Sequence, residues 1–125
     1  MNKTLKTAGM AVFLCLGALQ TAHAANLRWL NYSPVRFFTD QDWDIATAAG
    51  RQALNDTEDG VTVEWKNPAS SHYGSLTPLS TATKDGMTCR QLKIVNHANN
   101  LDGSSVYEFC KKPDGTWGAV GGTSD

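Results

Sequence analysis

Few side chains in this 125-residue chain belong to types that commonly carry out chemistry. Ser70, Ser71 and His72 are neighbours, and His97 lies in a later polar stretch. A hydrolase would need a serine or cysteine beside an oriented base, but no nucleophile-elbow or comparable motif surrounds these residues. Zinc would need three or four suitable ligands, and the spacing of the two histidines indicates no such set. The sequence therefore predicts no catalytic residues, no metal site and no cofactor.

The start of the chain predicts a secretory leader over residues 1–24. A lysine-containing start precedes an uncharged apolar run at residues 8–19, and Ala22-His23-Ala24 supplies the small-x-small pattern that signal peptidases accept. We expect cleavage between Ala24 and Ala25. The apolar run has about a dozen residues, whereas a membrane-spanning helix needs about 20. The mature protein is therefore expected to be exported and to lack a transmembrane segment.

Two alternatives for this start remain open. One is an uncleaved membrane anchor, and the other is a lipoprotein that is acylated at Cys15. Lipoprotein signals place small residues just before the acylated cysteine, whereas Phe13 and Leu14 precede Cys15 here. The cleaved leader is the preferred interpretation, with the protein in the periplasm, secreted or associated with the cell surface.

The charge balance of the mature chain is mildly acidic. Removing a leader that carries two lysines and no acidic residue leaves nine basic and twelve acidic residues, a formal net charge of −3. Nucleic-acid-binding domains carry a basic patch or stripe, which this composition does not favour. No long run of like charge indicates an electrostatic membrane tether.

Cys89 and Cys110 are the cysteines that remain after cleavage of the leader. Export leads to an oxidising compartment, where such a pair is expected to form a disulfide. Two separate buried thiols are the alternative. A bridge that closes a loop of about 20 residues would stabilise the fold by about 3 kcal/mol, because it restricts the unfolded chain.

Residues 40–55 predict one helix. Thr39 is a favourable N-cap, and Asp42 three residues later can complete a capping box. Phe38 and Trp43 occupy the positions of a hydrophobic staple. Small and apolar residues then recur at helical spacing and predict a narrow stripe that faces a sheet.

The segment before this helix is rich in apolar and aromatic residues. We expect it to cover the core, with a role for Trp29 and Phe37 as ligand platforms as the alternative. Its large apolar residues are Leu27, Trp29, Leu30, Tyr32, Val35, Phe37 and Phe38.

From Val61 onward, apolar residues alternate with polar ones and predict antiparallel strands. The predicted strands are residues 61–66, 74–83, 87–95, 106–111 and 116–120. Pro78 cannot donate to a β-ladder and is expected at an edge or a bulge. The expected connections are tight turns at Asp85-Gly86 and Pro113-Asp114-Gly115, a polar loop at 96–103 and a flexible tail at 121–125.

The expected disulfide fixes the pairing of the third and fourth strands. A hairpin centred on Asn99 and Asn100 places Cys89 directly opposite Cys110, at a separation that a disulfide can bridge. A turn at Asp102-Gly103 would separate the two sulfurs, so we prefer the first register.

These elements predict a single α+β domain over residues 25–120. One N-terminal helix packs on a four- to five-stranded antiparallel meander with one disulfide. The core candidates are large apolar residues of the helix and the strands: Trp43, Trp65, Leu92, Ile94, Phe109 and Trp117.

Four polar side chains form a possible interaction surface: Arg90, Lys93, His72 and His97. Arg90 follows Cys89 and therefore points to the opposite face of the sheet. It could meet an anionic partner, or it could pair with Glu64 or Glu108 across neighbouring strands.

The strand region also carries four motifs in a fixed order: Trp65-x-Asn67-Pro68, Gly74-Ser75-x-Thr77-Pro78, Gly86-x-x-Cys89-Arg90 and Cys110-x-x-Pro113-Asp114-Gly115-x-Trp117. Together they resemble the C-terminal domain of the bacterial seventeen-kilodalton surface antigen family, over roughly residues 38–120. The resemblance implies architectural roles for the matching residues. In this chain the segment before the domain does not show the lipoprotein signal and glycine-rich stretch common in the family, which favours a soluble periplasmic or secreted form.

The resemblance implies a non-enzymatic envelope or surface module that binds an envelope protein or glycan. Two alternatives remain. One is an inhibitor of a lytic enzyme, which would insert an exposed loop at 67–73 or 96–103 into a cleft. The other is an uncharacterised envelope enzyme.

Overall fold

The computed structural model describes residues 33–124. In chain order the elements are η2 (Pro34–Phe37), α1 (Asp40–Asp56), β1 (Val63–Asn67), β2 (His72–Lys84), β3 (Met87–Ala98), β4 (Leu101–Lys111) and β5 (Trp117–Ser124). The predicted leader, its cleavage site between Ala24 and Ala25, and the aromatic residues before Ser33 lie outside the described residues. Within residues 33–124, no helix has the length and apolar character needed to cross a bilayer.

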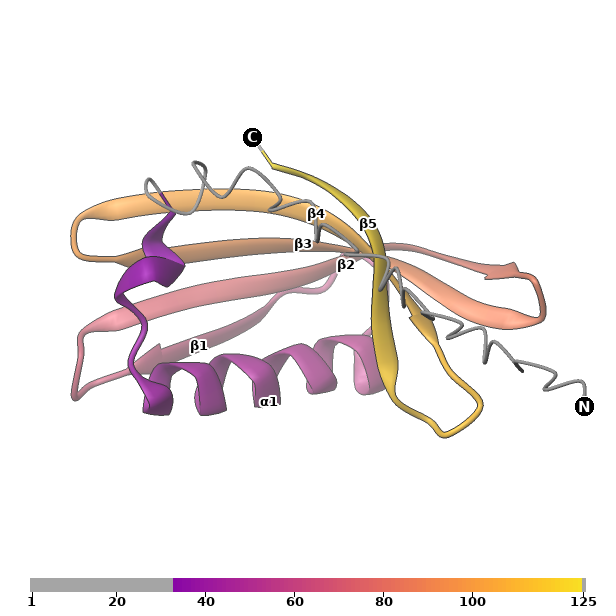
Figure 1. Ribbon diagram of the computed structural model, residues 1–125, viewed down its shortest axis with the longest axis horizontal. Coiled ribbons are helices and arrows are strands. Elements are labelled where there is room, and N and C mark those ends of the chain that lie inside the picture. Colours follow the sequence, from indigo (N-terminus) through magenta and orange to yellow (C-terminus); the bar gives the residue numbers. More distant parts are fainter. Residues whose placement is uncertain (1–32, 125) are drawn as a thin grey trace, which may run out of the picture.

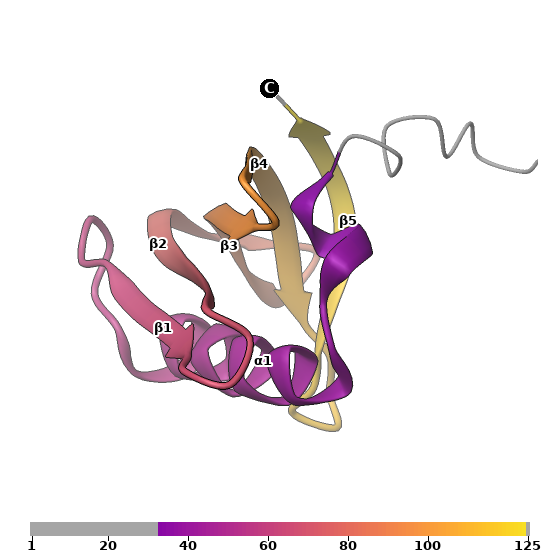
Figure 2. The same ribbon diagram turned by 90° about the vertical axis from the view of Figure 1, so that its left-hand side faces the viewer.

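The five strands pair in the order β1-β2-β3-β4-β5, each antiparallel to the next. The sheet is strongly twisted, and α1 lies across one face of it beside β1 and β2 (Figure 1, Figure 2). η2 packs on β3 and β4. This arrangement, with its single disulfide, confirms the predicted α+β fold. We call the face that carries α1 the inner face and the opposite face the outer face.

The start of α1 follows the predicted local pattern. The Thr39 hydroxyl accepts a hydrogen bond from the Asp42 amide at 3.1 Å, and the Asp42 carboxylate accepts one from the Thr39 amide at 2.8 Å. The rings of Phe38 and Trp43 meet edge to face, with 5.1 Å between their centroids. The capping box and the staple are therefore both confirmed.

The core lies between α1 and the inner side of the sheet. Its buried apolar side chains are Ala49, Ala53, Leu54, Trp65, Leu76 and Leu92. Five of the six predicted core residues lie in this core or against it: Trp65, Leu92, Ile94, Phe109 and Trp117. Trp43 is instead 46% exposed, so its prediction as a core residue is wrong. The Trp43 ring packs on Phe38 at the side of the helix, as part of the hydrophobic staple.

The β3–β4 hairpin has the predicted register. Cys89 lies opposite Cys110, and the two form a disulfide. The polar loop expected at 96–103 is wrong, because the strands continue to a two-residue turn at Asn99 and Asn100, with φ of 51° and 61°. Asparagine tolerates this left-handed region, which tight hairpin turns require. One of the two loops considered for an inhibitor, at 96–103, is therefore a hairpin with a two-residue turn.

Two further strand features bear on the predictions. The ladder between β2 and β3 shifts register between Pro78 and Ser80, which confirms the bulge at the proline. β5 continues to Ser124 through the glycines that the sequence assigned to a tail. Gly122 lies beneath the Tyr107 ring, where an added Cβ would come within 2.2 Å of the ring, so the close pairing of these strands needs glycine there.

Candidate functional site

A cluster of polar side chains surrounds Asp42 at the start of α1. Asp42 is fully buried. One carboxylate oxygen accepts hydrogen bonds from the Asn67 amide at 2.8 Å and the Ser70 hydroxyl at 2.6 Å. The other lies 2.7 Å from His72 Nδ1. The cluster ties the first turn of the helix to the turn between β1 and β2.

The electrostatics of this cluster favour a charged carboxylate. Burial alone would raise the pKa of Asp42, but the hydrogen bonds to it, first that of Ser70, outweigh burial and hold the pKa well below its ordinary value. His72 Nδ1 therefore donates its proton to this carboxylate. His72 is part of β2 and half-buried, whereas the sequence placed it in a solvated loop.

Ser70, His72 and Asp42 are the residue types of a hydrolytic triad, but they are not arranged as one. In a triad the serine hydroxyl bonds to the histidine, which takes up its proton. Here the Ser70 hydroxyl donates to Asp42 itself. The arrangement can hold the helix in place, and it does not activate the serine as a nucleophile. Among the described residues, no group of three or more potential ligands could hold a metal ion.

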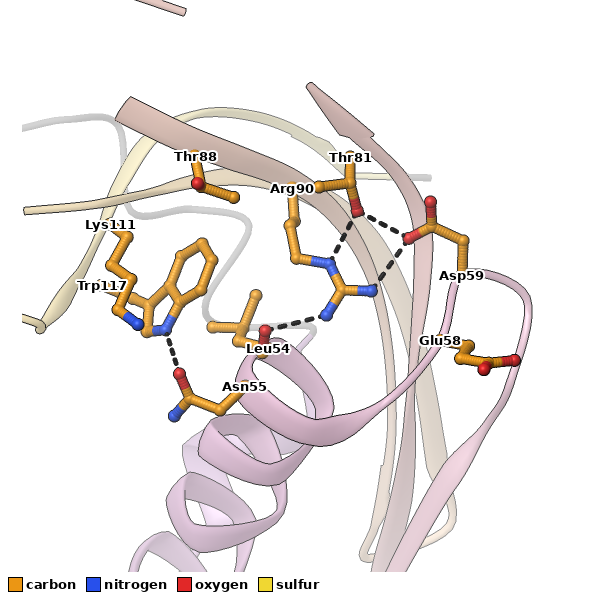
Figure 3. A pocket seen from close by; sticks show the side chains of 9 residues that line it. All are labelled: Leu54, Asn55, Glu58, Asp59, Thr81, Thr88, Arg90, Lys111 and Trp117. Carbon is orange, nitrogen blue, oxygen red and sulfur yellow. Dashed lines mark hydrogen bonds and ion pairs between the residues drawn. The ribbon is translucent and has the colours of Figure 1, made fainter. Parts of the chain in front are cut away.

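Arg90 forms a second polar cluster at the opposite end of α1 (Figure 3). Its side chain donates to the backbone oxygens of Ala53 and Leu54 at 2.9 and 2.8 Å. It also donates to the Thr57 oxygen at 2.7 Å, to the Asp59 carboxylate at 2.9 Å and to the Thr81 hydroxyl at 2.9 Å. The last carbonyls of a helix lack partners within the helix, and Arg90 supplies them.

The placement of Arg90 differs from both sequence interpretations. Its side chain is buried, and its acidic partner is Asp59 rather than Glu64 or Glu108. Glu108 pairs with Lys84 on the outer face instead. The hydrogen bonds from Arg90 and Thr81 lower the pKa of Asp59 below its ordinary value.

A recess of about 450 Å³ lies beside Arg90 and is lined by polar side chains and Trp117 (Figure 3). The indole nitrogen of Trp117 donates to the Asn55 side chain at 2.9 Å. All five N–H groups of Arg90 can be accounted for by contacts within the protein. This recess therefore borders a structural anchor and offers little unused hydrogen-bonding capacity from Arg90.

A larger hollow lies between the two polar clusters, on the inner face. It is a groove of about 1130 Å³ between α1, η2 and the inner side of β3, β4 and β5. Its aromatic lining residues are Phe38, Trp43, Trp65, Tyr107, Phe109 and Trp117. Because α1 covers mainly β1 and β2, the apolar inner side of β4 is left partly open. We call this hollow the aromatic groove.

The four predicted interaction residues do not share one surface. His72 and Arg90 lie on the inner face, at opposite ends of α1. Lys93 and His97 alternate with the inner-facing residues of β3 and therefore lie on the outer face. The His97 ring stacks on Tyr73 with 4.5 Å between centroids, and its Nδ1 contacts Asp102. A role of these residues in binding stays a prediction.

Comparison with known proteins decides the family. The profile of the 17 kDa outer membrane surface antigens matches residues 52–118, which is more than half of the chain. The chain belongs to this family. The surface-antigen domain begins inside α1 in this match and ends inside β5.

Curated relatives include 17 kDa surface antigens of Rickettsia felis and Rickettsia conorii, each 30% identical over 82 residues. A third, from Rickettsia bellii, is 31% identical over 83 residues. Each match covers 65% of this chain and 52% of the relative, so the chain spans about half the length of these surface antigens. No solved structure matches the chain.

The structure gives physical roles to the motif residues of this surface-antigen domain. Asn67 and Arg90 hold the two ends of α1, Cys89 and Cys110 join β3 to β4, and Trp65 fills the core. Sequence reasoning missed the partners of these residues, because Asp42 and Asn67 are 25 positions apart and Ala53 and Arg90 are 37 apart. The one local signal was Asp42 itself, which was identified for its capping role.

Proposed function

We propose that this chain is a non-enzymatic module of the cell envelope that binds an envelope protein through the aromatic groove. The observation that carries this proposal is a groove of about 1130 Å³ with a largely apolar lining on a small domain. Pockets of about 300–1,000 Å³ with apolar walls are typical binding sites, and exposed apolar surface of this kind marks interaction sites. Membership in a family of outer membrane surface antigens supports the envelope location.

The polar groups of the domain support a binding role over a catalytic one. The side chains of Asp42 and Arg90 are engaged in holding α1 to the sheet. Within residues 33–124, every buried side-chain nitrogen and oxygen has a hydrogen-bond partner. The exposed lining of the groove is mainly apolar, although polar side chains such as Arg51 and Asp102 also line it. Apolar side chains of a protein partner would bury surface against its aromatic rings.

The test compares two exposed aromatic residues. Trp43 lines the groove and is 46% exposed, while Tyr73 is 49% exposed on the outer face. The exported protein would be cross-linked in cells, and its partner would be recovered from the envelope fraction. Trp43→Ala should reduce recovery about fivefold or more, since loss of an aromatic anchor commonly weakens an interface by about 1–2 kcal/mol. Tyr73→Ala should leave recovery unchanged.

Two results would contradict the proposal. One is recovery of the protein only from the cytosol. The other is an equal effect of Trp43→Ala and Tyr73→Ala on partner recovery, because the groove would then contribute nothing specific.

A further inference from the structure

The described part of the chain begins at one end of the aromatic groove. Ser33, Pro34 and Val35 line the groove, and Pro34 is buried. An added Cβ on Gly103 of β4 would lie 2.8 Å from Pro34 Cδ, so the proline ring packs directly on the backbone of β4. Ser33 has an extended backbone, with φ of −86° and ψ of 136°. The residues that precede Ser33 are therefore tethered to the rim of the groove.

The tethered segment has the composition that the groove lining would accept. Residues 27–32 read Leu-Arg-Trp-Leu-Asn-Tyr, and four of these six residues are large and apolar or aromatic. The groove presents partly exposed rings of Trp43, Phe109 and Trp117. Burial of apolar surface against such rings is favourable, because it removes that surface from water.

The length of the segment also matches the groove. Six extended residues span about 20 Å. The stretch of β4 from Gly103, beneath Pro34, to Phe109 also covers about 20 Å at the rise of a strand. A short tether holds such a segment at an effective concentration on the order of millimolar, so even a weak affinity fills the groove.

We propose that residues 27–32 of the same chain occupy the aromatic groove when no partner is bound. This inference rests on the proposed function, because it describes how the same groove is covered before a partner binds. A partner must then displace the chain's own Trp29 and Leu30 from the groove. The apolar face is shielded from non-specific contacts until that exchange.

The direct test is photo-cross-linking in the full exported protein. A benzoylphenylalanine in place of Trp29 should cross-link within one chain to peptides of β3 and β4 that line the groove. The same probe in place of Tyr73, on the outer face, should give no groove-derived products. Products of dimeric mass would overturn the inference in favour of a second copy, and products outside the groove would overturn it altogether.

A dye measurement gives an independent readout. Trp29→Ser combined with Leu30→Ser, in the full exported protein, should increase binding of an environment-sensitive apolar dye. Adding Trp43→Ala should reduce that increase, since Trp43 lines the groove. Equal dye binding by the wild-type protein and the double variant would contradict the inference.

The two proposals fail in different ways. If Trp29 cross-links to the groove but Trp43→Ala does not affect partner recovery, the segment is a permanent part of the core and the proposed function fails. If Trp43→Ala reduces partner recovery but Trp29 gives no groove products, the proposed function stands and this inference fails.

Discussion

The two ends of α1 and the groove between them have opposite chemistry. At each end, one buried charged side chain has its hydrogen bonds satisfied within the protein. Between them, the aromatic groove leaves apolar rings partly exposed. A buried polar group without a partner costs about 1–3 kcal/mol, so the ends tolerate little change. The groove tolerates substitution better and is the region where binding can be altered without unfolding the domain.

The largest effect is expected at the start of α1. Asp42→Ala leaves buried Asn67 and the partly buried Ser70 and His72 without their shared acceptor, and we expect a loss of about 3 kcal/mol in the free energy of unfolding. Chemical denaturation would measure it. The matched control is Asp44→Ala, an exposed carboxylate of the same turn, which should change stability by less than about 0.5 kcal/mol. Equal effects of the two variants would show that the cluster does not hold the helix.

A somewhat smaller effect is expected at the end of α1. Arg90→Lys keeps the charge but cannot reproduce the planar set of five donors, and we expect a loss of about 2 kcal/mol. Lys93→Ala, on the outer face of the same strand, is the control and should be close to neutral. Hydrogen exchange should show faster opening of the last turn of α1 in Arg90→Lys only. Unchanged protection of that turn would contradict the assigned role.

The pH dependence of stability distinguishes the charge of Asp42 from its packing. The folded-state pKa of Asp42 lies below its unfolded value. The charged Asp42 carboxylate therefore contributes fully to folding stability above about pH 4, and this contribution is lost as the pH falls through the folded-state pKa. Stability of the wild-type protein should therefore decrease below about pH 4. Asp42→Asn should be less stable at neutral pH and show a shallower decrease in acid. A parallel decrease in both proteins would assign the acid sensitivity to other carboxylates.

The smallest effect on stability is expected at the groove rim. Trp43→Ala removes the staple contact with Phe38 and should lower the free energy of unfolding by about 0.5–1 kcal/mol. The same substitution is expected to have the largest effect on partner recovery. A loss of stability as large as that of Asp42→Ala would mean that the groove belongs to the core.

The sequence predicted what depends on neighbouring residues. The capping box joins Thr39 to Asp42 within one turn, and one disulfide was enough to place Cys89 opposite Cys110. The loop expected at 96–103 was wrong, because residues 96–103 form the ends of β3 and β4 and the turn between them. A polar run favours a loop by composition, but its inward-facing and outward-facing residues alternate in β3 and β4, and two asparagines make the turn.

The candidate site could not be predicted in the same way. Phe109 and Trp117 were expected in the core and do pack against it, but their place in the lining of the groove could not be predicted, because composition does not tell how much of a sheet one helix covers. The partners of Arg90 come from three separate segments, the end of α1, the following loop and β2. Such contacts depend on the curvature of the sheet, which the alternation of single strands does not specify.

Cys89 and Arg90 are neighbours in β3, so the disulfide and the anchor of the end of α1 share one strand segment. The disulfide lies on the outer face of β3. The side chain of the next residue, Arg90, points to the inner face, where it donates hydrogen bonds to the last carbonyls of α1. The disulfide joins to β4 the segment of β3 from which the Arg90 side chain extends. Reduction would remove the covalent link between β3 and β4 and leave the hydrogen bonds of Arg90 to the end of α1 in place.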